Sequence, residues 1–401
     1  MTAVRPSNAP GRTVTPTPPS RNPGDRGPQV PAPLNPPGRA VTSIPPSRNP
    51  GDRGPQSTGA TSALAGRSQL GTLAAVRVLA AVDKFRGTAT AIEVASAIAA
   101  ACSATGNECD KAPVSDGGEG WLDAFGGPNR RTIVTGPLGD PVDAPWRLSD
   151  GTAVIEMALA SGLLVAGGAE GNDALAATTT GTGDLIDAAL DAGATRIIVG
   201  LGGSATTDGG LGAIRAIHQP ARLKRVELLV ACDVRTKFAD AAKVFGPQKG
   251  ATPSEVELLT GRLQRLAQVY SSDFGVDVSD VEGSGAAGGL AGGLVALGGK
   301  LTPGFDLLSE ELGLEQRVVA ADLIITGEGF LDEQSFEGKV VGQMAALAAE
   351  HDKRIVAVVG NTYDGAEQRI ETISLVTCFG EDKAMNDTLQ SIESAVLQLL
   401  R

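Results

Sequence analysis

Short, uninterrupted apolar runs rich in β-branched residues alternate with helix-like segments along most of this chain. They predict buried strands at 77–82, 109–114, 152–158, 196–200, 226–233, 322–326 and 354–360. Helical patterns at 184–192, 254–270 and 340–350 lie between them. Strands that are apolar on both faces and are separated by helices are typical of parallel sheets covered on both sides. We therefore expect an α/β fold.

The helix after the first strand has a clear start. Thr90 and Glu93 have the spacing of a capping box, and an apolar stripe of Ile92, Ala95, Ala99 and Cys102 follows. After the second strand, Ser115 or Asp116 would cap the helix that carries Trp121. Turn signals between residues 136 and 151 predict a hairpin-like region.

The first 70 residues differ in composition from the rest of the chain. Fifteen of the 24 prolines precede Ser57, and residues 8–29 return almost unchanged at 35–56. A stretch so rich in proline, arginine and glycine cannot bury enough apolar surface to offset the entropy lost on ordering. We expect a disordered tail with a duplicated segment. No window of the chain reads as a membrane span.

Composition argues against several classes of function. A net charge of −12 disfavours a nucleic-acid partner. The four cysteines lack CxxC spacing, and His218 and His351 are the sole histidines, which disfavours a zinc site and histidine-dependent nucleophilic catalysis. Free thiols fit a reducing cytoplasm. Neither GxxxxGK[ST] nor the protein-kinase motifs occur.

Polar, glycine-rich loops follow several of the predicted strands. Three of them carry acids: VSDGGEG at 114–120, GLGGSATTDGG at 200–210 and TGEGFLDEQSFEGK at 326–339. Glycine lets backbone amides surround an anion, whereas Asp and Glu bind divalent cations, so these loops indicate a site for metal-bound phosphate. Ligands of open parallel sheets bind beyond the carboxyl ends of the strands, and we expect the loops to converge on one crevice.

The charged residues of these loops suit a small-molecule kinase, which needs cations for the phosphoryl group and carboxylates for Mg²⁺ and the acceptor hydroxyl. The candidate cations are Lys84, Arg86, Lys249 and Lys339, and the candidate acids are Asp83, Asp116, Glu119, Asp208, Glu328 and Asp332. Simpler interpretations stay open at some of them. Asp83 and Asp116 could cap the helices that follow, and Lys249 and Lys339 could be solvated.

Two other functions also stay open at this point. Gly200, Gly202 and Ala205 have a dinucleotide-binding spacing after a predicted strand, and a later strand ends in Asp233. This pattern indicates an NAD(P)-dependent oxidoreductase of a small hydroxy acid. The second alternative is an inactive paralogue that binds a small acid, although the full set of acids and lysines argues against it.

From about Val78 to Leu400 the chain resembles the bacterial glycerate kinases of the type that phosphorylates the 2-hydroxyl group. The matching segments, in the family's order, are DKFRGTATAIEVASAI, PVSDGGEGWLDAF, TGPLGDPV, AVIEMALASGL, ATTTGTGDLIDAALDAGATRIIVGLGGSATTDGG, ACDV, VFGPQKGAT, GSGAAGGL and ADLIITGEGFLDEQSFEGK. The resemblance implies that ATP and Mg²⁺ convert D-glycerate to 2-phosphoglycerate. The segment from Gly212 to Val226 is shorter than in the family, which bears on substrate fit.

The resemblance also implies an architecture. A Rossmann-like parallel-sheet domain would comprise residues 71–133 and 285–401, with a second α/β domain inserted at 134–284 and the active site in the cleft between them. The disordered tail, residues 1–70, falls outside the resemblance. We expect a cytoplasmic enzyme with glycerate and a nucleotide as its partners, and a homodimer is compatible with the sequence.

Carried over by matching segments, the resemblance suggests roles for individual residues. The expected catalytic residues are Asp208, Asp332, Lys339 and Arg86, and the expected substrate-binding residues are Asp83, Lys84, Arg86, Ser204, Thr206 and Thr207. The expected nucleotide contacts are Gly117, Gly118, Gly202, Gly203, Lys249, Gly327 and Glu328. The expected metal ligands are Asp116, Glu119, Asp208 and Asp332.

Overall fold

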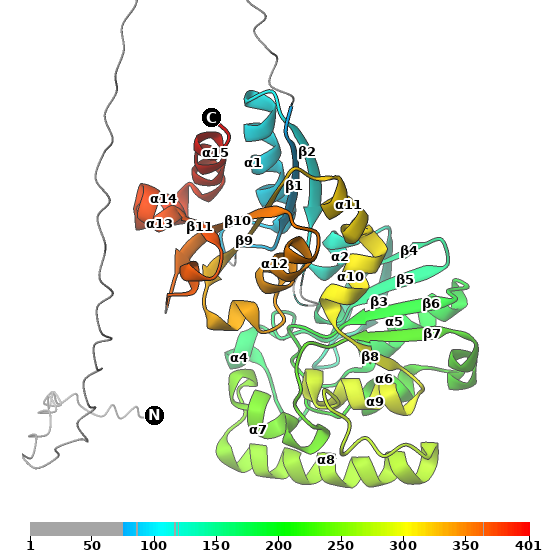
Figure 1. Ribbon diagram of the computed structural model, residues 1–401. Coiled ribbons are helices and arrows are strands. Elements are labelled where there is room, and N and C mark those ends of the chain that lie inside the picture. Colours follow the sequence, from blue (N-terminus) through cyan, green and yellow to red (C-terminus); the bar gives the residue numbers. More distant parts are fainter. Residues whose placement is uncertain (1–74, 86, 116–117, 119, 364) are drawn as a thin grey trace, which may run out of the picture. The chain divides into compact units, whose positions relative to one another are not determined.

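The computed structural model describes residues 75–401 with the exception of residues 86, 116, 117, 119 and 364. The predicted disordered tail therefore lies outside the described residues. Gly71–Arg401 forms one compact unit, in which the strands make two sheets (Figure 1). The predicted α/β class with parallel sheets is confirmed.

The first sheet consists of five parallel strands. Their order across the sheet is β11 (Glu371–Ser374), β10 (Arg354–Thr362), β9 (Leu323–Leu331), β1 (Arg77–Val82) and β2 (Glu108–Pro113). The chain places β2 on one side of β1 and later returns to place β9 on the other. Ligands of open α/β sheets bind at such a switch in strand order. The fold thus points to the carboxyl ends of β1 and β9.

The second sheet is mixed. Its order is β3 (Arg130–Thr135), β4 (Pro141–Ser149), β5 (Thr152–Glu156), β6 (Arg196–Gly200), β7 (Glu227–Ala231) and β8 (Lys300–Thr302). The first three strands are antiparallel, as the turn signals indicated, and β5 to β8 are parallel. Because β8 pairs with β7, residues 285–302 belong with this sheet, whereas the predicted insertion ended at residue 284. The division into two domains stays a prediction.

Helices cover both sheets. The α-helices in chain order are α1 (Ala91–Ala104), α2 (Trp121–Ala124), α3 (Ala158–Ser161), α4 (Gly168–Gly171), α5 (Thr180–Asp191), α6 (Leu211–Ala216), α7 (Ala241–Phe245), α8 (Pro253–Phe274), α9 (Leu290–Ala296), α10 (Gly304–Leu312), α11 (Leu314–Ala320), α12 (Val340–Glu350), α13 (Leu375–Phe379), α14 (Glu381–Asn386) and α15 (Thr388–Leu399). The 3-10 helices are η1 (Pro220–Arg225), η2 (Phe238–Asp240), η3 (Pro247–Lys249), η4 (Ala286–Gly289), η5 (Glu333–Phe336) and η6 (Ala366–Gln368). Among the described helices, none has the length and apolarity needed to cross a membrane.

Three apolar cores hold the sheets and helices together. On one face of the first sheet, α1 and α15 pack over β1 and β10, with Ile98 at the centre. The opposite face shares a core with the second sheet, where Leu79 of β1 and Ile198 of β6 belong to one cluster. Helices α5, α6 and α9 cover the other face of the second sheet through residues such as Leu185 and Leu290. One continuous core therefore joins the two sheets.

The start of α1 is as predicted, and the predicted stripe is buried at Ala95 and Cys102 but not at Ile92. The Thr90 hydroxyl accepts a hydrogen bond from the amide of Glu93, whose carboxylate accepts one from the amide of Thr90. This reciprocal pair is a capping box. Ile92, however, is 44% exposed, whereas Val94 and Ile98 are fully buried. The apolar residues of this helix are too numerous for spacing alone to select the buried face.

The helix after β2 begins without a capping side chain. Gly120, at φ +86°, occupies the cap position of α2, so Ser115 does not cap this helix as predicted, and Asp116 lies outside the described residues. The following Trp121 is fully buried. A Cβ on Gly200 of β6 would lie 2.7 Å from its indole ring. Close packing between Trp121 and β6 therefore fixes the position of α2.

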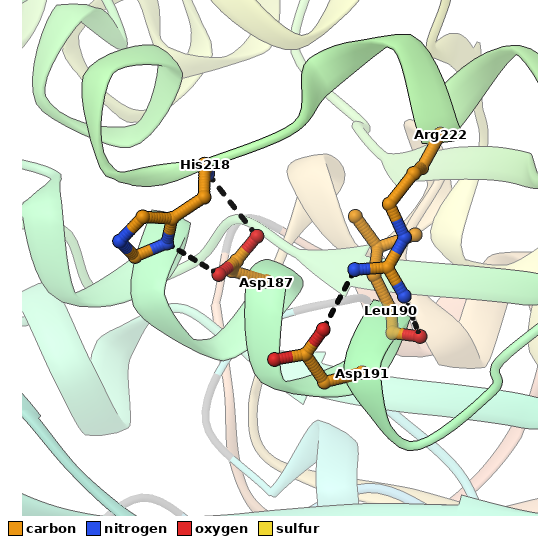
Figure 2. Close-up of polar contacts among 5 residues, drawn as sticks. All are labelled: Asp187, Leu190, Asp191, His218 and Arg222. Atoms are coloured by element: carbon orange, nitrogen blue, oxygen red, sulfur yellow. Dashed lines mark hydrogen bonds and ion pairs between the residues drawn. The ribbon is translucent and has the colours of Figure 1, made fainter.

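The segment after α6 is held against α5 by two surface ion pairs (Figure 2). His218 Nδ1 lies 2.7 Å from Asp187 Oδ2, and the His218 amide also donates to that carboxylate. Arg222 donates to the carboxylate of Asp191 and to the carbonyl of Leu190. This is the segment that the sequence showed to be short. His218 thus helps to hold this segment against α5.

Candidate functional site

Four charged side chains predicted as site residues gather near the carboxyl ends of β1 and β9. These are Asp83, Glu328, Asp332 and Lys339, here called the carboxylate cluster. Lys339 Nζ lies 3.7 Å from Asp332 Oδ1. Glu328 is close enough to the charges of the other three to have its protonation affected by them. The structure thus brings these four residues together at the switch in strand order.

Glu328 is a partly buried carboxyl of the cluster. It lies within β9 and not in the predicted loop, because this strand continues to Leu331. Burial raises the pKa of Glu328 to about 7, against the lowering effects of a hydrogen bond from Ser335 and the charge of Lys339. Its Oε1 has no hydrogen-bond partner in the described part of the chain. This oxygen is available to a proton or a cation.

Asp332 is held in place by Ser335, a residue that we did not predict to belong to the site. The amide and hydroxyl of Ser335 donate to Asp332 Oδ1 at 2.9 and 3.1 Å, and the Asp332 amide donates back to the hydroxyl at 3.0 Å. The Asp332 side chain stays 33% exposed. A spacing of three between Asp and Ser is the available sequence signal, since it permits this reciprocal cap.

A cleft of about 470 Å³ lies where loops from the two sheets meet. The loops after β1 and β2 contribute Lys84 and Gly118, and the loops of the second sheet contribute Ser204, Asp233 and Lys249. The volume is in the range of small-molecule and cofactor sites. We define this cavity as the cleft.

Lys84 connects the cleft to the carboxylate cluster. Its Nζ lies 3.6 Å from Asp83 Oδ1, and 14% of the side chain is exposed. Lys84 and Asp83 also line a second hollow of about 330 Å³, together with Ser115. The Ser115 hydroxyl is buried and has no hydrogen-bond partner among the described residues. Polar groups thus extend without interruption from the cluster to the cleft.

Lys249 is the most buried cation of the site, with 2% of the residue exposed. Its Nζ donates to the Ser204 hydroxyl and to the Thr206 carbonyl, both at 2.7 Å. Burial lowers the pKa of Lys249 to about 7, although the charge of Asp208 opposes the shift. An ammonium group has three donors, so one remains for a ligand. Asn172, which the sequence did not mark, fixes this loop by donating to the Lys249 carbonyl at 2.9 Å.

Asp208 is saturated with hydrogen bonds from its own chain. Its Oδ2 accepts from the amides of Thr179 and Gly212 and from the hydroxyls of Thr178 and Thr179. Its Oδ1 accepts from the amide of Gly210. The side chain therefore ties its loop to the start of α5 and of α6. This arrangement argues against the predicted role of Asp208 as a metal ligand or base.

The loop at 202–210 contributes to two different cavities. Ser204 lines the cleft. Thr207 and Asp208 line a separate hollow beside α6 and α8. Thr206 is fully buried and meets Lys249 through its carbonyl oxygen, not its hydroxyl. Of the hydroxyl groups predicted to bind substrate, Ser204 is thus the one that lines the cleft.

The predicted nucleotide-binding glycines also separate into two groups. Gly118, Gly202 and Gly203 line the cleft. Gly327 lies inside β9 instead, where a Cβ would come within 2.1 Å of the Val358 carbonyl oxygen. Tight strand pairing accounts for glycine at that position.

Four predicted site residues lie outside the described residues. They are Arg86, Asp116, Gly117 and Glu119. Their expected roles in substrate, nucleotide and metal binding stay predictions.

The dinucleotide-binding spacing is not matched by the local structure. That fingerprint needs a glycine turn that leads directly from a strand into a helix. After β6, however, the chain makes a long loop, and α6 begins only at Leu211. Asp233 Oδ1 accepts a hydrogen bond from the amide of Gly304 at 2.9 Å. The geometry therefore does not favour an NAD(P) site here.

The described residues contain no group of three or more His, Cys, Asp and Glu side chains arranged to hold a metal ion. Mg²⁺ bound to a nucleotide needs fewer protein ligands. One or two carboxylates are enough, because phosphate oxygens and waters complete its coordination shell. The carboxylate cluster, with the unpartnered Oε1 of Glu328, meets this smaller requirement.

Comparison with known proteins decides the family. The family model described as the glycerate kinase family matches residues 78–220 and 217–401. The chain belongs to the glycerate kinase family. The resemblance seen in the sequence is confirmed, and the protein is a kinase, a small-molecule phosphotransferase. The two matches meet at residues 217–220, inside the short segment that Figure 2 shows fastened to α5.

Individual glycerate kinases are similar over most of their length. Glycerate 2-kinase of Escherichia coli K12 is 38% identical over 329 residues, which cover 72% of this chain and 86% of that protein. Glycerate kinase of Bacillus subtilis 168 is 39% identical over 326 residues, covering 71% and 85%. A solved structure from Salmonella typhimurium LT2, described as a glycerate kinase 2, has a TM-score of 0.68 and 33% identity, covering 81% of this chain and 97% of that one.

Proposed function

We propose that this glycerate kinase family member transfers the γ-phosphoryl group of ATP to the 2-hydroxyl of D-glycerate, giving 2-phosphoglycerate and ADP. The observation that carries the proposal is that Lys84 and Lys249, which follow strands of different sheets, line one cleft beside the carboxylate cluster. A kinase of a small acid needs cations for the substrate carboxylate and for the phosphoryl group, and a carboxylate near the acceptor hydroxyl. The Escherichia coli relative is named a 2-kinase, which supports the position of transfer.

The two lysines would bind the two substrates, Lys84 the glycerate and Lys249 the phosphates of ATP. Lys84 is only loosely paired with Asp83, at 3.6 Å, so its ammonium can donate to the glycerate carboxylate. The part predicted for Arg86 in substrate binding stays a prediction. Lys249 and Ser204 share a hydrogen bond at 2.7 Å and would contact phosphoryl oxygens. The glycines Gly118, Gly202 and Gly203 line the same cleft and let backbone amides approach the phosphates.

Asp332 is the best candidate for the carboxylate that accepts the hydroxyl proton. Its Oδ1 is fixed by Ser335, its Oδ2 accepts no hydrogen bond from the described residues, and the side chain is partly exposed. Lys339, at 3.7 Å, would offset charge on the phosphoryl group as it moves. We reassign Asp208 to a structural role, because both of its oxygens accept hydrogen bonds from neighbouring residues.

Mg²⁺ bound with the nucleotide would neutralise the charge on the β- and γ-phosphates. Within the carboxylate cluster, Asp83 and Glu328 would hold it, since Glu328 Oε1 lacks a partner among the described residues. Asp116 and Glu119 keep their predicted place as further ligands. A cytoplasmic location and a homodimer stay predictions from the sequence.

A coupled assay of ADP release, run on the full chain with ATP, Mg²⁺ and a panel of small hydroxy acids, tests the proposal. We expect D-glycerate to give the fastest turnover and phosphorus NMR to identify 2-phosphoglycerate as the product. Lys84→Ala should lower kcat/KM by about 100-fold, because the substrate carboxylate loses its partner. Lys243→Ala, which removes an exposed lysine from α7, is the matched control and should leave activity unchanged.

Other outcomes would favour the alternatives. Formation of NAD(P)H with a hydroxy acid would indicate the oxidoreductase. Glycerate binding without turnover would indicate the inactive paralogue. Release of 3-phosphoglycerate would contradict the proposed position of transfer.

A further inference from the structure

A hollow with an apolar floor lies on the side of the 202–210 loop that does not line the cleft. Its volume is about 400 Å³. Helices α6 and α8 supply most of its walls, and its apolar lining consists of Leu175, Leu211, Leu263, Leu266 and Val269. We call this cavity the arginine hollow, for the three arginines at its edge.

Three arginines, Arg215, Arg262 and Arg265, line this hollow, and all three are exposed. None of the three is ion-paired with a carboxylate in the described part of the chain. Arg262 donates a hydrogen bond to the carbonyl of Leu175. Three exposed, unpaired cations in one place are notable in a chain whose net charge is −12, and they create a local field that attracts anions.

The carboxylate of Asp208 also lines the arginine hollow, and it does not neutralise these cations by direct pairing. Its two oxygens are occupied by hydrogen bonds from the loop and from the start of α5 and α6. The single negative charge of Asp208 is outnumbered by the three arginines that line the same hollow. The arginines therefore dominate the polar side of the cavity.

A second, independent sign of a ligand is the side chain of Thr207. This residue is 2% exposed and lines the same hollow. Its Oγ1 is buried and has no hydrogen-bond partner among the described residues. Buried hydroxyl groups in native proteins are nearly always paired, so Thr207 leaves a hydrogen-bonding group unused at the wall of the hollow.

We propose that the arginine hollow binds a small amphipathic organic anion at a site separate from the cleft. The ligand would carry a phosphate or carboxylate head on a planar or branched apolar body. Arginine forks bind such heads bidentately. The leucine floor would take the apolar body, and Thr207 would hydrogen-bond to the head. The cavity volume falls in the range of small-ligand sites.

Calorimetric titration of the full chain with phenyl phosphate tests this site. We expect saturable binding to the wild type, and inorganic phosphate should bind at least about tenfold more weakly because it cannot use the apolar floor. Arg265→Ala should weaken phenyl phosphate binding about tenfold. Arg131→Ala, which removes an arginine paired with Asp143 on β3, is the matched control and should not change the affinity.

Thr207→Val supplies a second test that does not depend on charge. It keeps the shape of the side chain and removes the hydroxyl, so binding should weaken severalfold while the melting temperature is kept. Absence of binding, equal affinity of the Arg265→Ala variant, or equal affinity for phenyl phosphate and inorganic phosphate would each overturn the proposal. Displacement of phenyl phosphate by ATP and Mg²⁺ would also overturn it, because the hollow would then belong to the nucleotide site.

Discussion

The two sheets carry acidic residues in comparable loops but use them differently. After β9, Asp332 accepts hydrogen bonds from the described residues at one oxygen, and the donor is Ser335. After β6, Asp208 accepts hydrogen bonds at both oxygens from four residues of its own chain. A carboxylate with filled lone pairs fixes a loop, whereas one with an open oxygen can accept a proton or bind a cation. The difference is the basis for proposing a chemical role for Asp332 and a structural one for Asp208.

Asp332→Asn should have the largest effect on activity. The variant keeps an oxygen that can accept from Ser335 but loses the negative charge, so we expect kcat to fall by about 1,000-fold and the melting temperature to change little. ADP release and thermal unfolding measure the two quantities. Asp143→Asn, at an exposed acid paired with Arg131, is the control. Near-normal turnover of Asp332→Asn would remove this residue from the mechanism.

Asp208→Ala should show the opposite pattern. The variant leaves the amides of Thr179, Gly210 and Gly212 without their acceptor, so we expect the free energy of unfolding to drop by about 2–4 kcal/mol. Turnover per folded molecule should stay within about tenfold of wild type. Urea denaturation and active-fraction kinetics test both points. A stable but inactive Asp208→Ala enzyme would contradict the structural role and would indicate that Asp208 takes part in catalysis.

Burial of Lys249, which lies in η3, leads to a prediction about the pH dependence of stability. Because burial lowers the pKa of Lys249 to about 7, whereas lysine in an unfolded chain titrates near about 10.4, the unfolded state binds more protons between these values. The free energy of unfolding should therefore gain a rising contribution as pH increases from about 7 to about 10. Lys249→Met should lack it. Urea denaturation of both proteins across this window measures the difference, and equal slopes would contradict the assigned burial effect.

Much of the fold could be predicted from the sequence, because the spacing of apolar residues reflects which side chains are buried. Helix α12 has the predicted bounds, Val340–Glu350, and β1 has the predicted bounds Arg77–Val82. Strand β9 was predicted too short, because Gly327 resembles a loop residue. Its glycine instead allows close approach to the Val358 carbonyl of the neighbouring strand. A contact between strands far apart in sequence leaves no local signal.

The site was harder to predict than the fold, for a related reason. The sequence placed acids and lysines after strands, and the structure brings Asp83, Glu328, Asp332 and Lys339 together. It could not show that Asp208 also accepts hydrogen bonds from Thr178 and Thr179, because these donors at the start of α5 lie about 30 residues away in the sequence. Which carboxylate oxygens remain free of hydrogen bonds depends on the conformation of the folded loop and not on residue type.

The smallest expected effect concerns a third kind of acid, Asp187, which pairs with the exposed His218 of the short segment in Figure 2. Its hydrogen bond and its charge raise the pKa of His218 above the usual value for histidine, which is about 6.5. The pair should therefore stabilise the fold fully below about pH 6.5, and the contribution should vanish as pH rises through the raised pKa. Because the His218 side chain is 83% exposed, solvent screens the pair and the change in stability should be slight.

Asp187→Asn isolates this effect from the chemistry. NMR titration of the His218 ring in wild type and variant should show a lower pKa in the variant, with His351, which lies near Glu315, as the internal control. Activity should not change, since both residues of the pair lie on the surface between α5 and the segment after α6. An unchanged His218 titration would mean that the pair does not persist in solution. The segment would then be held by Arg222 and its contacts with Asp191 and Leu190.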